Sequence, residues 1–107
     1  MLHRGEVVAL RAPRDAKGRE QTGQRYAVVV QSDEFEWLST VVVAPTSISA
    51  QRTIFRPEIT VRGKRTRVLV DQLSTVDRGR LGRPAGRLSA DQMDELETSL
   101  IRILGVF

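Results

Sequence analysis

Residues 18–30 read Gly-Arg-Glu-Gln-Thr-Gly-Gln-Arg-Tyr-Ala-Val-Val-Val, and they join a polar segment to a run of apolar residues. The run 27–30 is continuous instead of alternating, which is typical of a strand buried on both faces. Arg25 stands at the root of this strand and takes its rigidity from it, whereas the preceding loop supplies mobility and positive charge. An arginine held in this way can bind a phosphate through two donors.

The segments on either side of this run predict two neighbouring strands. Residues 6–10 begin after a glycine and are largely apolar, and residues 40–44 form a β-branched run. Pro45 is expected to end the second of these strands, because proline cannot donate to a ladder. Residues 11–24 hold almost nothing apolar and are expected to form a long surface loop. We expect the strands at 25–31 and 40–44 to be hairpin neighbours.

The second half of the chain predicts short strands at 59–61 and 67–70, joined by a turn at 62–64, with 73–76 continuing after a bend. The third and last part is a helix. Ser89 and Gln92 have the spacing of a capping box, and Gly105 is placed to end the last turn. The apolar residues that recur at helical spacing are Met93, Leu96, Leu100, Ile103 and Leu104. We expect this stripe to cover an open end of the sheet.

These elements predict a mainly β fold: one strongly bent antiparallel sheet or partial barrel with a C-terminal α-helix, as a single domain over residues 1–107. The formal charge is +4, from 17 Lys and Arg against 13 Asp and Glu, and this charge is compatible with a nucleic acid or an acidic protein as partner. No stretch is long and apolar enough to span a membrane, so we expect a cytoplasmic protein.

The residue inventory excludes several kinds of catalytic site. The chain has no cysteine, so disulfides, thiolate metal sites and a cysteine nucleophile are absent. His3 is its one histidine and lies at the N-terminus, which argues against a mechanism that uses a pair of histidines. RNA carries its own nucleophile, the ribose 2′-hydroxyl, so one arginine and one neighbouring hydroxyl make a minimal nuclease site without metal or cofactor.

The hydroxyl candidates are Thr46 and Ser47, which directly follow Pro45. Antiparallel pairing brings the end of this strand close to the start of the strand that begins at Arg25. Either hydroxyl can therefore face the arginine.

The segment with Gly18, Gln21, Gly23 and Arg25 resembles the signature of MazF/PemK-type toxins, the sequence-selective endoribonucleases of bacterial toxin-antitoxin pairs. In this family a Gly-bounded loop with Gln and Arg precedes an Ala-Val-Val strand. Residues 70–81, Val-Asp-Gln-Leu-Ser-Thr-Val-Asp-Arg-Gly-Arg-Leu, resemble a second family stretch. The family also carries Pro-x-Thr-Ser or Pro-x-Thr-Thr after the second strand, but here the residue between Pro and Thr is missing.

The resemblance implies an SH3-like barrel that forms a homodimer, with single-stranded RNA in a groove across the interface and a MazE-like antitoxin as protein partner. It implies attack by the 2′-hydroxyl to give a 2′,3′-cyclic phosphate and a 5′-hydroxyl, with no cofactor and no metal. Arg25 would be catalytic together with Thr46, or with Ser47 if the register slips. The expected RNA-binding residues are Lys17, Arg19, Gln21, Gln24, Tyr26, Asp71, Gln72, Ser74 and Arg78.

Two other functions remain as alternatives. The first is a non-catalytic toxin of the same fold that inhibits DNA gyrase through a C-terminal tail with Trp and Gly, but this chain ends Leu-Gly-Val-Phe and has its one tryptophan at position 37. The second is an RNA-binding barrel without chemistry, which would expose several aromatic residues on one sheet face. Only five aromatic residues are present. Both alternatives are therefore weaker than the nuclease.

Overall fold

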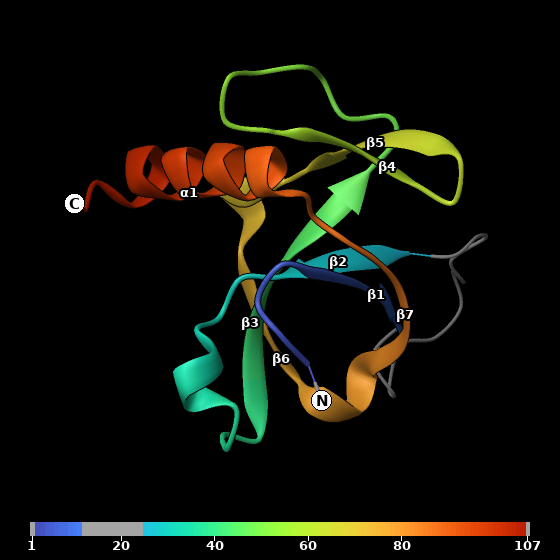
Figure 1. Ribbon diagram of the computed structural model, residues 1–107, viewed down its shortest axis with the longest axis vertical. Helices are drawn as coiled ribbons and strands as arrows, with labels where there is room; N and C mark the ends of the chain where they lie inside the picture. Colours follow the sequence, from blue (N-terminus) through green and yellow to red (C-terminus); the bar gives the residue numbers. More distant parts are fainter. Residues whose placement is uncertain (1, 12–24, 107) are drawn as a thin grey trace, which may run out of the picture.

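Strand β2 (Tyr26–Val29) lies in the middle of the sheet, between β1 (Glu6–Leu10) and β3 (Thr40–Ser47). The computed structural model describes residues 2–11 and 25–106, and its strands curl into a half-barrel on which one helix packs (Figure 1). Within these residues the strand order is β4-β5-β3-β2-β1-β7, and β6 also pairs with β3. All pairings are antiparallel. The predicted mainly β fold with a C-terminal helix is confirmed.

The run 27–30 is buried on both faces, as its continuous apolar character predicted. Val28 and Val30 belong to a cluster that also contains Leu96 of the helix, whereas Ala27 and Val29 belong to a second cluster on the opposite face. The sheet therefore has a core on each side of β2 and β3. This double burial fixes the register, because a shift by one residue would exchange the two faces.

Strand β3 continues through Pro45 to Ser47, so the prediction that Pro45 ends it is wrong. The carbonyl of Pro45 accepts a hydrogen bond from the amide of Leu69 at 2.8 Å. The nitrogen of Pro45, which carries no hydrogen, faces the same edge of β3 as this carbonyl. On that edge β3 changes partner, from β6 (Ser74–Asp77) over residues 40–43 to β5 (Lys64–Val68) at residues 46–47. Proline is tolerated there because it falls between the two ladders.

The hairpin of β4 (Glu58–Val61) and β5 turns at Arg62 and Gly63, with φ of 52° and 79°. Positive φ at both central residues is the geometry of a two-residue turn that matches the twist of the strands. Strand β5 begins earlier than the predicted start at residue 67. A turn of 3₁₀ helix at Val70–Gln72 forms the bend before β6. The turn was therefore predicted and the strand's start was not.

Strand β7 (Leu81–Arg87) was not predicted from the sequence. It contains Gly82, Pro84 and Gly86 and pairs with β1 through an irregular register that shifts twice. Glycine and proline normally weaken a strand, and they are tolerated here because β7 lies at the edge of the sheet among the strands that the structure describes. Two short 3₁₀ turns, Asp33–Phe35 and Arg78–Arg80, complete the connections.

Helix α1 (Ala90–Leu104) begins and ends as the sequence predicted. The Ser89 hydroxyl accepts from the Gln92 amide at 3.1 Å, the Gln92 side chain accepts from the Ser89 amide at 2.8 Å, and Gly105 closes the helix with φ 69°. Leu96 is completely buried, and Met93 and Leu100 pack against the same cluster. Ile103 and Leu104 are exposed, so the last turn of the predicted stripe extends past the core.

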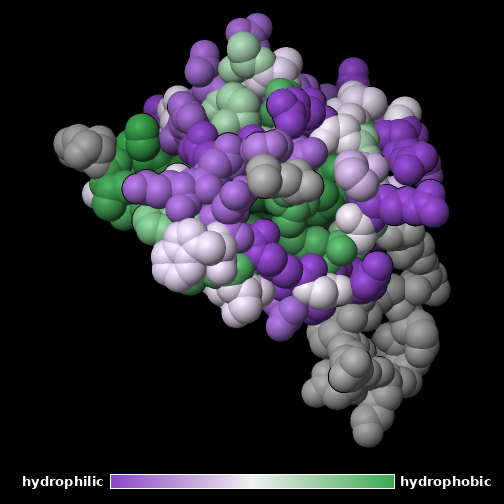
Figure 2. Space-filling view, turned by 60° about the horizontal axis from the view of Figure 1, so that its bottom comes forward, coloured by the Kyte–Doolittle hydropathy of each residue, from purple (hydrophilic) through white to green (hydrophobic). Residues whose placement is uncertain are grey.

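The end of α1 forms an exposed apolar surface. Its residues are Ile101, Ile103, Leu104 and Val106. Figure 2 shows hydrophobic side chains gathered at this end of the molecule, and a second hydrophobic area near the middle of the same view. Several exposed aliphatic residues in one place are a common mark of a protein contact.

The buried helix face should contribute strongly to stability. We expect Leu96→Ala to lower the free energy of unfolding by about 2 to 5 kcal/mol, because it leaves a cavity in the cluster between α1 and the sheet. Ile54→Ala removes as many carbon atoms from a residue that is 77% exposed, and should change it by about 0.5 kcal/mol or less. Urea unfolding followed by circular dichroism measures both. Equal effects of the two substitutions would contradict the assignment of Leu96 to the core.

Candidate active site

The ends of β2 and β3 bring the predicted catalytic residues close together. The ladder pairs Val29 with Val43, Val28 with Ala44, and Ala27 with Pro45. Continued by two residues, the same register sets Tyr26 opposite Thr46, and Arg25 opposite Ser47. The Arg25 carbonyl accepts a hydrogen bond from the amide of Leu10 at 2.8 Å, so the main chain of Arg25 is held against β1.

Side chains of directly opposed residues lie on the same face of a sheet, and successive residues alternate. Tyr26 packs against the cluster that includes Val28 and Ala44, on the side of α1. Thr46 follows Ala44 by two residues and shares that face. Arg25 and Ser47 belong by the same alternation to the other face. The register therefore sets the arginine beside Ser47, whereas Thr46 projects to the opposite side of the strand pair.

The hydrogen bonds of the Thr46 and Ser47 hydroxyls also distinguish the two residues. Thr46 Oγ1 donates to the carbonyl of Tyr26 at 3.2 Å, so it ties β3 to β2 at the end of their ladder. Ser47 Oγ accepts from the Ser49 amide at 3.3 Å and lies 3.3 Å from the Ser49 hydroxyl. Ser47 is half-buried and Arg25 is exposed. The extended register thus brings a guanidinium group and a hydroxyl group to the same end of the β2–β3 pair.

Four of the expected RNA-binding residues, Lys17, Arg19, Gln21 and Gln24, lie outside the described residues. Tyr26 is half-buried and packs on the core, with its ring on the face opposite to Ser47. The other expected residues lie in the segment from the 3₁₀ turn at Val70–Gln72 through β6 to the next 3₁₀ turn. They are Asp71, Gln72, Ser74 and Arg78.

Asp71 is held by a forked contact with Arg56. Arg56 Nε donates to Asp71 Oδ1 at 3.0 Å, and Nη2 donates to Oδ2 at 2.9 Å. The Arg56 side chain lowers the pKa of Asp71 below its ordinary value, and the same contact raises the pKa of Arg56. Arg56 also donates to the carbonyl of Gln51 at 3.2 Å and stacks 5.6 Å from the ring of Phe55. The pair thus anchors the segment before β4 to the 3₁₀ turn at Val70–Gln72.

Ser74 and Arg78 lie farther from the site. Ser74 pairs with Val43, four residues before Ser47 on β3. Arg78 follows Asp77, which pairs with Thr40 at the other end of β3, and its Nε donates to the carbonyl of Leu38. Seven residues of strand separate Thr40 from Ser47, which corresponds to roughly 20 Å. Within one chain, Arg78 is therefore not brought together with Arg25.

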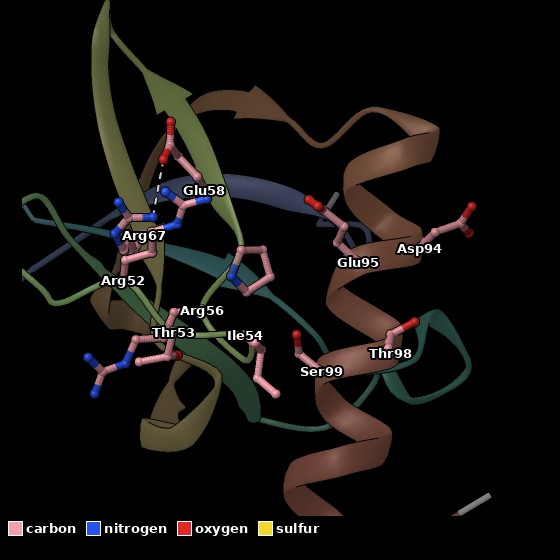
Figure 3. Close-up of a pocket in the computed structure, with 11 residues that line it drawn as sticks. Arg52, Thr53, Ile54, Arg56, Glu58, Arg67, Asp94, Glu95, Thr98 and Ser99 are labelled. Carbon is pink, nitrogen blue, oxygen red and sulfur yellow. Dashed lines mark hydrogen bonds and ion pairs between the residues drawn. The ribbon is translucent and has the colours of Figure 1, made fainter.

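A groove of about 740 Å³ lies between the segment before β4 and helix α1, and sequence reasoning missed it (Figure 3). Its arginines are Arg52, Arg56 and Arg67, and α1 contributes the carboxylates Asp94 and Glu95. The only signal in the sequence was the alternation of arginine with Thr66 and Val68 in β5, which marks a strand with one polar face.

The described residues contain no group of three or more His, Asp or Glu side chains able to hold a metal ion. In the same part of the chain, no helix has the length and apolar character needed to cross a membrane.

Comparison with known proteins places the chain in a defined group. Residues 3–104 match the family model of the PemK-like, MazF-like toxin of type II toxin-antitoxin systems. A protein of Mycobacterium tuberculosis (strain ATCC 25618 / H37Rv), named "Putative toxin Rv3098A/RVBD_3098A", is 43% identical over 107 residues, which is 99% of this chain and 100% of that protein.

Two solved structures share the fold. One is a MazE-MazF complex from Deinococcus radiodurans, with a TM-score of 0.79 and 21% identity over 99% of this chain and 97% of that one. The other is an endoribonuclease in complex with its cognate antitoxin from a mycobacterial species, with a TM-score of 0.76 and 16% identity over 99% and 95% of the two chains. At these identities the likeness shows the fold alone.

The Arg56–Asp71 pair predicts a loss of stability in acid. Because the pKa of folded Asp71 is lowered, the pair stabilises the fold above the pKa of the unfolded aspartate, about 3.9, and this contribution is lost as the pH falls through the folded value. We expect Asp71→Asn to lower the thermal midpoint at pH 7, and the difference from the parent protein to shrink as the pH falls below about 3.9. Thermal unfolding between pH 3 and pH 7 measures this difference.

Asp94→Asn is the matched control, because Asp94 is an exposed carboxylate with no ion pair to any residue that the structure describes. Its midpoint should follow that of the parent protein at every pH. A constant gap between Asp71→Asn and the parent across the whole range would contradict the role given to the ion pair.

Proposed function

The chain belongs to the family of PemK-like, MazF-like toxins of type II toxin-antitoxin systems, and from this membership we propose that it is an endoribonuclease. It cuts single-stranded RNA at selected sequences and needs no metal ion. The ribose 2′-hydroxyl attacks the adjacent phosphorus, the bond from phosphorus to the 5′-oxygen breaks, and the products carry a 2′,3′-cyclic phosphate and a 5′-hydroxyl. One proton leaves the 2′-oxygen and one is added to the 5′-oxygen.

The observation that carries this proposal is the register of β2 and β3, which pairs Ala27 with Pro45 and, continued by two residues, puts Arg25 opposite Ser47. In the transition state, negative charge grows on the non-bridging phosphate oxygens, and preorganised donors at that point lower the barrier. The Arg25 guanidinium supplies two such donors in a fixed fork. The backbone of Arg25 is bonded to β1, so its position is set before RNA arrives.

We assign the catalytic hydroxyl to Ser47. Thr46, the other candidate, donates to the Tyr26 carbonyl and belongs by strand alternation to the face that packs toward α1. Ser47 shares the face of Arg25, and its hydroxyl hydrogen can turn toward a phosphate oxygen while the Ser49 amide donates to its oxygen. On this assignment Thr46 holds the two strands together at the site.

Arg25 acts mainly by stabilising charge. A guanidinium stays protonated in proteins and is a poor proton acceptor, so the proton of the 2′-hydroxyl passes to water or to another group near the phosphate. The expected contacts of Lys17, Arg19, Gln21 and Gln24 with RNA belong to the same proposal. These residues lie in the segment before Arg25, where basic side chains can bind phosphates on either side of the cut.

We further propose that the toxin acts in the cytoplasm as a homodimer and that a MazE-like antitoxin inhibits it. The exposed apolar end of α1 supports a protein contact of this kind. The net charge of +4 favours an acidic antitoxin segment that competes with RNA. Among the structural relatives, a MazE-MazF complex and an endoribonuclease with its cognate antitoxin show that toxins of this fold bind such partners.

Incubation of the purified protein with a long RNA in EDTA tests the reaction. We expect discrete cuts with cyclic phosphate ends in the presence of the chelator, because no metal takes part. Arg25→Ala should lower kcat by about 100-fold or more, the effect of removing a preorganised donor from a transition state. Primer extension and end-group analysis of the products measure both results. Cleavage that is abolished by EDTA and restored by Mg²⁺ would overturn the mechanism.

The two hydroxyls are separated by Ser47→Ala and Thr46→Val. We expect Ser47→Ala to lower kcat with little effect on folding, whereas Thr46→Val keeps the cutting activity and lowers the thermal midpoint, because it removes the bond to Tyr26. The opposite pattern, with activity lost only in Thr46→Val, would move the hydroxyl role to Thr46.

A further inference from the structure

Strand β5 continues the row that Arg25 and Ser47 begin. On its second edge β3 pairs with β5, and Ser47 is directly opposite Arg67. The next strand sets Glu58 opposite Arg67. Ser47, Arg67 and Glu58 thus lie side by side across β3, β5 and β4, and the extended register of β2 adds Arg25 on the other side of Ser47.

Burial confirms the face of Arg67. Thr66 and Val68, the neighbours of Arg67 on β5, are both buried, and Val68 is in the cluster that contains Leu96 of α1. Arg67 must therefore project to the other face of the strand, which is also the face of Ser47. Adjacent strands are about 4.8 Å apart, so Arg25 and Arg67 flank Ser47 at about that spacing on either side. Both long side chains can reach an anion held over the serine.

The Arg67 side chain is already ordered. It is 22% exposed, and its Nη1 donates to Glu58 Oε1 at 3.1 Å, as Figure 3 shows. The second oxygen of Glu58 lies 3.3 Å from Nε of Arg65, a side chain that is 82% exposed. One carboxylate is thus shared by two arginines, which leaves the trio with one surplus positive charge. Pairs this exposed are weak, so a phosphate can compete with Glu58 for Arg67.

Arg67 also lines the groove that leads from β5 toward α1, which carries Arg52 and Arg56 on one side and the carboxylates Asp94 and Glu95 of α1 on the other. It therefore belongs both to the face that carries Ser47 and to a path along which a nucleic acid strand can continue. We propose that Arg67 is a second phosphate-binding residue, which holds the RNA backbone next to the phosphate bound by Arg25, and that Glu58 occupies it until RNA binds. This inference rests on the proposed function.

Binding to an uncleavable RNA tests the inference apart from the chemistry. The probe is a fluorescent, mixed-sequence single strand with 2′-O-methyl groups throughout, titrated onto the full chain at several salt concentrations. We expect Arg67→Ala to weaken binding about tenfold, the effect of one charge-assisted hydrogen bond, and to reduce the slope of log K against log salt by about 0.7. Arg65→Ala is the matched control, because it removes the same charge and the same partner, Glu58, two residues along the strand.

Glu58→Gln separates a phosphate-binding role from a structural one. If Arg67 binds phosphate, loss of the competing carboxylate should tighten RNA binding about two- to fivefold, whereas loss of a merely structural ion pair would weaken it. Arg67→Gln serves if Arg67→Ala fails to fold, as judged by circular dichroism. Equal binding by the Arg67 and Arg65 variants, or weaker binding by Glu58→Gln, would overturn the inference. The proposed function would be unaffected by that result if RNA cleavage still depended on Arg25. Tight binding lost in Arg67→Ala, without any cutting by the parent protein, would instead overturn the proposed reaction.

Discussion

The pairing of β2 with β3 is the constraint on which the rest of this molecule depends. Both strands are apolar on two faces, and each face is covered by its own cluster of buried side chains. A slip of one residue would turn Val28 and Ala44 away from α1 and bring Ala27 and Val43 in their place, so the core permits a single register. That register sets Arg25 opposite Ser47. The core thus determines the candidate site through the register of the two strands.

Strand β3 does more than pair with β2, because it changes partner along its other edge. Its first half pairs with β6 and its last two residues pair with β5, and Pro45 lies between the two ladders. A residue with an N–H at this point would present a donor to a gap between strands. Proline presents none, so the strand can continue to Ser47 without an unpaired amide. The branch then brings β5 with Arg67 to the far side of Ser47.

Much of this fold is predictable from local signals. The capping box of α1, the two-residue turn at Arg62 and Gly63 and the doubly buried run at 27–30 each depend on residues close in sequence. Strand β7 and the end of β3 depend on partners that are distant in sequence. Pro84 is tolerated because β7 lies at the edge of the sheet, and Pro45 is tolerated because β3 changes its pairing partner there. The proline signal at residue 45 was therefore right about local preference and wrong about where the strand ends.

The same division holds for the site. Arg25 and a hydroxyl after Pro45 follow from the sequence, because each lies at the end of a recognisable apolar run. The choice between adjacent hydroxyls requires the register, since neighbouring residues on a strand face opposite sides. The position of Arg67 beside Ser47 can be found only from the pairing of β3 with β5, because Arg67 is 20 residues away from Ser47 in sequence. A site that spans three strands is visible in a sequence only in part, and the missing part is the portion contributed by the most distant strand.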